Sequence, residues 1–181
     1  MAKRIYNQTA LFGELYAYLV VISPPDSVLA EIAKIKRVMN AIADIGDRNL
    51  YSVGHITLTD KLTDDDSFPE TIANLLKGQT KFSVKLSGVG QSNHKDKNII
   101  LLHVADPEPI INLSRLLKSP SKSPHVALAK RISPETLAAL QPYLINLSFE
   151  AEWICEEILV LRKRMSQKEK GFREQFKIPL I

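Results

Sequence analysis

The stretches HITL (residues 55–58) and HVAL (residues 125–128) are two copies of one short pattern, and they decide how the rest of the chain is interpreted. Each has a histidine, an aliphatic residue, a small residue and a leucine within a strand-like run. Because side chains alternate along a strand, the histidine and the third residue share one face, while the aliphatic residue and the leucine share the other. The pattern therefore predicts two half-buried strands, each holding a histidine on a rigid element.

Two such histidines side by side suit acid–base chemistry on phosphate esters. The ordinary pKa of histidine, about 6.5, allows both protonation states near neutral pH, and each proton transfer is typically worth about 10² to 10⁴ in rate. The hydroxyl of Thr57 would donate a hydrogen bond to a phosphate oxygen. Lys130 or Arg131, directly after the second motif, would neutralise the phosphate, and alternation lets at most one of them face the site. The catalytic candidates are therefore His55, His125 and Thr57.

The remaining sequence predicts an α+β domain with antiparallel strands. Helices are expected from a cap at Asp26 or Ser27 to Ile42, over 68–77, from Pro107 to about Lys118, and after a cap at Ser133. Gly88, Gly90 and the polar stretch 91–97 are expected to form the long loop of a hairpin, and the aspartates at 64–66 to cap a helix rather than bind a metal. The strand-like runs are Leu15–Ile22, Tyr51–Thr59, Lys81–Leu86, Asn98–Val104, His125–Lys130, Asn146–Trp153 and Glu156–Arg162.

Length and composition point to one domain over residues 1–181. The 181 residues are 45% hydrophobic, which is enough for one core, and no apolar run is long enough to cross a bilayer. The first residues lack a secretory pattern, so we expect a cytoplasmic protein without membrane contact. Cys155 is the only cysteine, and we expect it to be a passive packing residue.

The positive charge is concentrated in a basic C-terminal segment, residues 162–177. This segment holds seven basic residues against two acidic ones, which leaves the rest of the chain at minus one out of a net charge of +4. Such a segment attracts polyanions such as nucleic acid, or it forms a solvated, partly helical tail. The sequence leaves both interpretations open.

The chain resembles the two-histidine (2H) phosphoesterases, which include the 2'-5' RNA ligases and RNA 2',3'-cyclic phosphodiesterases. The resemblance rests on the two motifs, on Pro24-Pro25 after the first strand, on SPHVALAK at residues 123–130 and on IPL at residues 178–180. It implies a bilobal, pseudo-two-fold arrangement of antiparallel sheets with flanking helices and a central groove. It also implies opening of cyclic phosphates without metal or cofactor, with an RNA terminus or a small cyclic nucleotide as the partner, and it is compatible with a monomer.

Ala127 departs from the family pattern, which has threonine or serine at this position. Loss of one preorganised donor typically costs about 10² to 10³ in rate, unless Ser123, Lys130 or a water replaces it. We therefore keep two hypotheses: an enzyme with impaired or altered turnover, and a binding module that holds a nucleotide or an RNA end without turnover. A metal-dependent nuclease is a distant third, because no ligand set or phosphate-binding glycine loop is recognisable. His94 and His103 are not assigned to the site.

Overall fold

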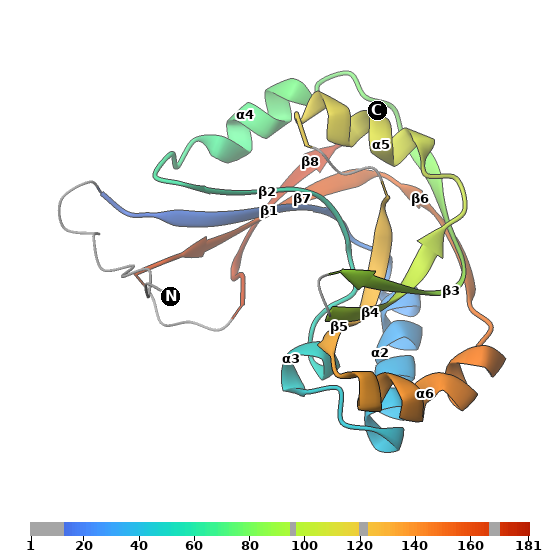
Figure 1. The fold of residues 1–181 in the computed structure, drawn as a ribbon. Helices are drawn as coiled ribbons and strands as arrows, with labels where there is room; N and C mark the ends of the chain where they lie inside the picture. The colour runs from blue at the N-terminus through green and yellow to red at the C-terminus, as the bar shows by residue number, and fades with distance from the viewer. Residues whose placement is uncertain (1–12, 95–96, 120–122, 167–170) are drawn as a thin grey trace.

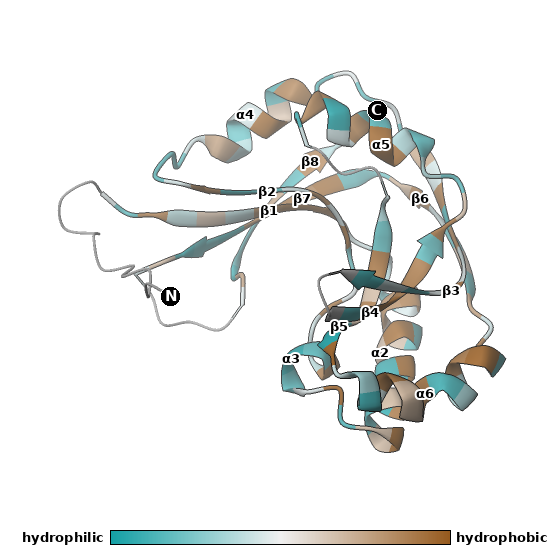
Figure 2. Ribbon diagram, viewed as in Figure 1, coloured by the Kyte–Doolittle hydropathy of each residue, from teal (hydrophilic) through white to brown (hydrophobic). Residues whose placement is uncertain are grey.

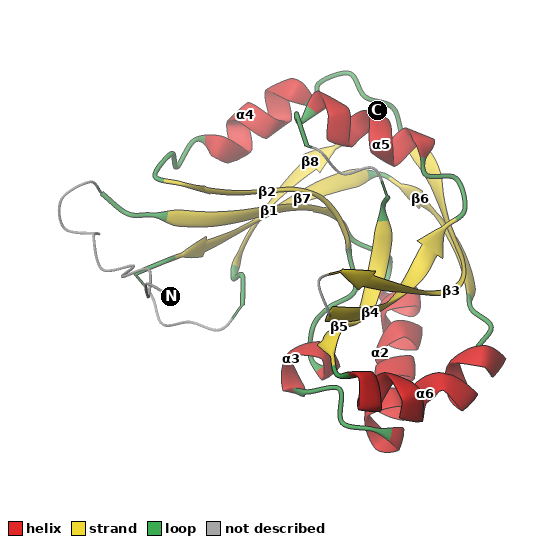
Figure 3. Cartoon of the chain, viewed as in Figure 1, coloured by secondary structure: helices red, strands yellow, loops and turns green. Residues whose placement is uncertain are grey.

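The strands of the chain form one antiparallel sheet, and helices pack around it (Figures 1 and 3). The computed structural model describes residues 13–94, 97–119, 123–166 and 171–181. The strands are β1 (Tyr16–Ile22), β2 (Ile56–Thr63), β3 (Phe82–His94), β4 (Lys97–Val104), β5 (His125–Ile132), β6 (Glu150–Cys155), β7 (Glu157–Arg164) and β8 (Glu174–Pro179). The helices are α2 (Asp26–Ile42), α3 (Asp47–Leu50), α4 (Phe68–Leu75), α5 (Glu108–Leu116) and α6 (Pro134–Asn146).

The sheet consists of two four-stranded halves that meet at the histidine motifs. Its strand order is β6-β3-β4-β5-β2-β1-β7-β8, so β5 and β2 lie at the centre. They are joined by a single register pair, Ile56 opposite Val126, which we call the joint. The α+β fold class and the two-part antiparallel arrangement are confirmed, with the two parts fused into one curled sheet (Figure 1).

Two helices contact the half of the sheet to which their preceding strand does not belong. Helix α2 packs against β5 and α6, whereas α5 packs against β2. In Figure 1, α4 and α5 lie along one side of the sheet, and α2, α3 and α6 gather at the other end. Helices α2 and α5 thus help to fix the two strands that carry the histidine motifs.

The core forms on the face of the motifs opposite to the histidines. Ile56, Leu58 and Val126 are 0% exposed and Leu128 is 1% exposed, and all four belong to one continuous apolar cluster. Figure 2 shows hydrophobic and hydrophilic residues alternating along the strands and helices, as elements with one buried and one exposed face require. The predicted alternation of the two motifs is confirmed.

Several predicted boundaries differ from the structure. Strand β2 begins at Ile56 rather than Tyr51, so His55 lies just before the strand and not within it. The short helix α3 at residues 47–50 was not expected. Strand β3 continues through the expected loop, and a bulge between Leu86 and Val89 absorbs Gly88 in a left-handed conformation (φ 81°). Gly88 therefore lies in a bulge within a long strand instead of ending a short one.

The predicted helix starts are partly confirmed. The Ser133 side chain accepts a hydrogen bond from the backbone N–H of Thr136 (3.1 Å), as a helix cap should. Helix α2 instead has Pro25 at its cap position and no side-chain cap, so Asp26 is its first residue. Part of the linker expected at residues 119–124 lies outside the described residues.

The described residues of the basic C-terminal segment belong to two paired strands and their flanking turns rather than to a partly helical tail. Strand β8 pairs with β7, and residues 167–170 between them lie outside the described part of the chain. Glu174 forms ion pairs with Arg162 and Arg164, and Lys177 pairs with Glu157 at 2.8 Å. These carboxylates offset part of the local positive charge. Among the described residues, no helix is long and apolar enough to cross a membrane.

Candidate active site

The joint between β2 and β5 brings the two motifs side by side. Extending its antiparallel register by one residue in each direction places Thr57 opposite His125 and His55 opposite Ala127. All four residues lie on the face opposite to the buried pair, and all are partly exposed. The third residue of each motif therefore lies beside the histidine of the other motif, which the sequence did not reveal.

Both histidines are held by the same local hydrogen bond. Nδ1 of His55 lies 2.9 Å from the carbonyl oxygen of Val53, and Nδ1 of His125 lies 2.9 Å from the carbonyl oxygen of Ser123. Because a carbonyl only accepts, each Nδ1 carries the proton, and Nε2 is the atom left to take up or release a proton. Ser123, considered above as a substitute donor, thus contributes its backbone carbonyl.

A bulge in β5 decides which cation shares the face of the histidines. Leu101 pairs with Ala127, but Ile100 pairs with Ala129, so β5 contains one extra residue here. Leu128 and Ala129 are both 1% exposed and point into the core. Alternation resumes one residue later, which returns Lys130 to the histidine face.

Arg131 is not brought to the same face. It follows Lys130, is exposed and has a left-handed backbone (φ 60°) that non-glycine residues seldom adopt. Of the two basic candidates, the structure therefore brings only Lys130 toward the histidines.

Asn49 fixes the backbone of Lys130. Its Oδ1 accepts a hydrogen bond from the Lys130 N–H (2.9 Å), and its Nδ2 donates to the Lys130 carbonyl (3.0 Å) and to the Ile45 carbonyl (2.7 Å). The side chain thus pairs with β5 as a neighbouring strand would, beyond the joint. This clamp ties the segment that leads into His55 to the strand that begins at His125.

A second buried group supports the same segment. Lys36 on α2 is 1% exposed, and its Nζ donates to both the carbonyl and the hydroxyl of Ser52, each at 2.8 Å. Burial, with a smaller contribution from the charge of Lys130, lowers the pKa of Lys36 to about 8. A buried ammonium group that has no carboxylate partner is costly in free energy. Groups whose pKa is shifted in this way are found most often at functional sites.

The surroundings of His55 favour its neutral form. Burial is the main cause that lowers the pKa of His55, and the hydrogen bond to Val53 opposes it. The positive charges of Lys130 and Lys36 lower this pKa further, as does His125. Neutral imidazole with a free Nε2 is the form that accepts a proton.

His103, which was left out of the predicted site, lies directly beside His125. The two are register partners on β4 and β5, so they share a face of the sheet. Sequence reasoning missed it because cross-strand register cannot be read from a single strand. The side chain of His94, the other unassigned histidine, lies outside the described part of the structure.

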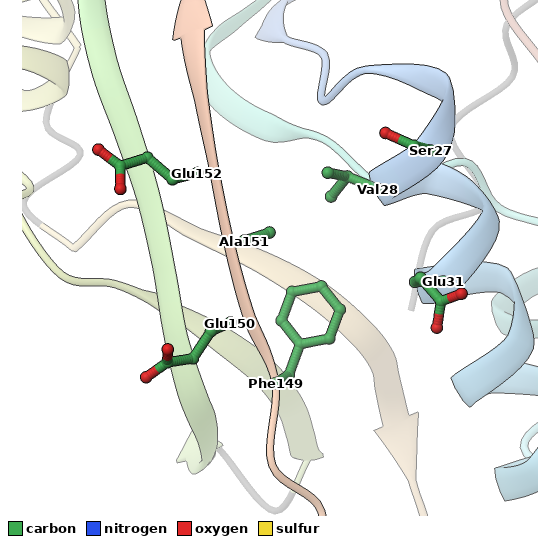
Figure 4. Close-up of a pocket in the computed structure, with 7 residues that line it drawn as sticks. All are labelled: Ser27, Val28, Glu31, Phe149, Glu150, Ala151 and Glu152. Carbon is green, nitrogen blue, oxygen red and sulfur yellow. The ribbon is translucent and has the colours of Figure 1, made fainter.

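Neither described cavity is lined by a histidine, although one of them reaches the segment directly before His55. One, of about 280 Å³, lies between the start of α2 and residues 149–152; Figure 4 shows Phe149 and Ala151 directed toward the helix, with Glu150 and Glu152 directed away. Another, of about 560 Å³, lies between α2 and residues 50–54. Within the described ranges, no three histidine, cysteine or carboxylate side chains are grouped as a metal site. The candidate site is therefore the exposed surface around the joint.

Comparisons with known proteins identify the family. Structures with the same fold include TT0787 of Thermus thermophilus (TM-score 0.62, 16% identity, covering 90% of this chain and 97% of that one). E. coli LigT complexed with 3'-AMP has the same fold, with a TM-score of 0.58 and 15% identity over 91% of this chain and 98% of that one. Kluyveromyces marxianus Usb1 also has it, with a TM-score of 0.53 and 13% identity over 91% of this chain and 98% of that one. Comparison with curated protein sequences gives no match. The model of the 2'-5' RNA ligase superfamily matches residues 24–166, and the chain therefore belongs to this superfamily of phosphoesterases and RNA ligases.

Proposed function

We propose that this protein is a metal-independent phosphodiesterase that opens 2',3'-cyclic phosphates at RNA ends, or of a related small cyclic nucleotide. The observation that carries the proposal is the matched pair His55 and His125, on one face beside the joint, each with Nδ1 bound to a carbonyl and Nε2 available. Family membership supports phosphate-ester chemistry in general. The nearby Lys130 supplies positive charge for an anionic substrate.

The proposed reaction needs only water and the two histidines. Nε2 of one histidine takes a proton from water as the water oxygen bonds to phosphorus. One ring P–O bond breaks, and the second histidine, as imidazolium, gives its proton to the departing ribose oxygen. Thr57, beside His125, donates a hydrogen bond to a non-bridging oxygen, where negative charge increases.

The electrostatics of the site suggest how the roles are divided. Burial, Lys130 and Lys36 all lower the pKa of His55, which favours the neutral, proton-accepting form. We therefore assign the general base to His55 and the general acid to His125. The sequence alone offered no basis for this division.

The test is hydrolysis of a short RNA ending in a 2',3'-cyclic phosphate, in excess chelator, by the wild type, His55→Ala and His125→Ala. We expect wild-type ring opening that persists in chelator and falls by about 10² or more in each variant. Asn112→Ala, an exposed change on α5, is the control and should keep full activity. Turnover that chelator abolishes, or that persists at the wild-type rate in either histidine variant, would refute the mechanism.

The alternative is a binding module without turnover, and Ala127 is the observation that favours it. Ala127 lies opposite His55 and offers no hydroxyl there, so a bound phosphate lacks one donor at the proposed base. The same assay separates the two functions. RNA binding without ring opening, weakened by loss of either histidine, is the result expected of a binding module.

A further inference from the structure

His103 occupies a defined position on the histidine face. It lies opposite His125 in the β4–β5 register, and its side chain is exposed. Together with Thr57, it forms a row across three neighbouring strands, with His125 in the middle. Since adjacent strands are about 4.8 Å apart, His103 lies one strand beyond the reacting pair, on the side away from His55.

The ring of His103 rests on a glycine of the next strand. A Cβ atom placed on Gly90 would lie 2.1 Å from Nε2 and 2.6 Å from Cε1 of His103, so no larger residue fits under the ring where it lies. Gly90 does not have a positive φ, so its backbone conformation does not by itself call for glycine. The His103 ring occupies the space that a side chain at position 90 would need, and this explains why residue 90 is a glycine.

Among the described residues, none forms a hydrogen bond with the His103 ring, and the ring lies outside the described apolar core. An exposed aromatic ring on a strand, held close to a glycine of the next strand, is a surface on which a ligand can pack. Nucleobases of RNA ends stack on such rings, histidine included.

We propose that His103 is the platform on which the nucleobase of the bound nucleotide stacks. The proposal rests on the proposed function only in that a nucleotide is the ligand, and it does not require turnover. With the phosphate between His55 and His125, the nucleoside extends over β4 and β3, where the ring rests on Gly90. His103 then contributes to recognition of the nucleoside and leaves the phosphate to the central residues.

The test measures binding of adenosine 2'-monophosphate and of inorganic phosphate by calorimetry, for the wild type, His103→Ala, His103→Phe and His103→Gln. Loss of a stacked base typically costs about fivefold or more in affinity. We expect His103→Ala and His103→Gln to weaken nucleotide binding by about tenfold, His103→Phe to retain it, and all variants to bind phosphate like the wild type. Asp106→Asn, an exposed change just after β4, is the control and should leave both affinities unchanged.

Gly90→Ala tests the same contact without touching the histidine. The added methyl group displaces the ring, so nucleotide affinity should fall as in His103→Ala, while the protein stays folded because a side-chain rotation relieves the clash. Unchanged nucleotide affinity in His103→Ala would overturn the proposal. So would rescue by glutamine but not by phenylalanine, since that pattern indicates a hydrogen bond. A wild type that binds the nucleotide through His103 but opens no cyclic phosphate would refute the catalytic proposal and leave the platform standing.

Discussion

At the scale of single residues, the two motifs differ most at their third position. Thr57 lies beside His125, whereas Ala127 lies beside His55, so a hydroxyl flanks only the proposed acid. Because a preorganised donor acts on the charge that develops in the transition state, the missing hydroxyl affects the side where water attacks. The proposed base therefore works without a neighbouring hydroxyl.

Restoring this hydroxyl should raise the rate. We expect Ala127→Thr to increase kcat for cyclic-phosphate opening by about tenfold or more, because it adds a donor near the non-bridging oxygens. Ala127→Val, which has nearly the same shape without the hydroxyl, should give no increase. Equal rates for threonine and valine would show that the hydroxyl does not matter at this position.

The electrostatic bias on His55 can be measured directly. Lys130 lowers the pKa of His55, so Lys130→Gln should raise this pKa and move the acidic limb of the pH–rate profile to higher pH. NMR titration of the His55 ring is the measurement. Arg131→Gln should leave the pKa of His55 unchanged, because the charges that lower this pKa are those of Lys130, Lys36 and His125. A shift of equal size in both variants would contradict the selection of Lys130 by the β5 bulge.

At the scale of elements, Asn49 joins α3 to β5 through both polar groups of the Lys130 backbone. Asn49→Ala removes these bonds and leaves the Lys130 N–H and carbonyl without these partners, so we expect the free energy of unfolding to fall by about 1–3 kcal/mol. Chemical denaturation measures this change. Asn112→Ala removes an exposed side-chain contact and should change stability by less than about 0.5 kcal/mol. Equal decreases in the free energy of unfolding for the two variants would show that the hydrogen bonds of Asn49 to Lys130 do not stabilise the fold more than an exposed contact does.

Helix α2 carries a buried lysine whose titration should appear in the stability of the protein. The pKa of Lys36 is about 8 in the fold against 10.5 for an exposed lysine, so between these values the unfolded chain binds more protons. Stability from this group therefore rises with pH across that window, by up to about 3 kcal/mol. We expect this rise in the wild type and its loss in Lys36→Met, measured by denaturation from about pH 7 to about pH 11. Parallel pH profiles for the two proteins would show that Lys36 does not carry the effect.

At the scale of the whole molecule, the two halves of the sheet share one core although a single register pair joins their backbones. Ile56 lies at this joint and is 0% exposed, so Ile56→Ala should lower the free energy of unfolding by about 2–5 kcal/mol. Because the core is continuous, unfolding should remain one transition by fluorescence and by circular dichroism. Ile154→Ala, on an exposed side chain, should change stability by less than about 0.5 kcal/mol.

Two separate unfolding transitions would show that the halves are independent, and would contradict the prediction of one domain over residues 1–181. Coincident transitions would support it. The single domain therefore stays a prediction, although the eight strands in the described part of the chain belong to one sheet.

The sequence by itself determined the local features of this protein. The alternation in HITL and HVAL predicted which side chains are buried, Ser133 predicted a helix start, and the repeat predicted a strand at each motif, with His125 in β5 and His55 directly before β2. These predictions succeeded because they depend on contacts within one element. The basic segment 162–177 was interpreted less well, since nothing local showed that β8 pairs with β7.

Only the tertiary structure decided which residues meet. Register placed Ala127 beside His55 and His103 beside His125, the bulge at Leu128 and Ala129 selected Lys130 over Arg131, and Lys36 reached the site from a distant helix. Each of these outcomes depends on a contact between segments far apart in the chain. A one-residue shift in strand register reverses the face on which every later side chain lies, so no local pattern determines such contacts.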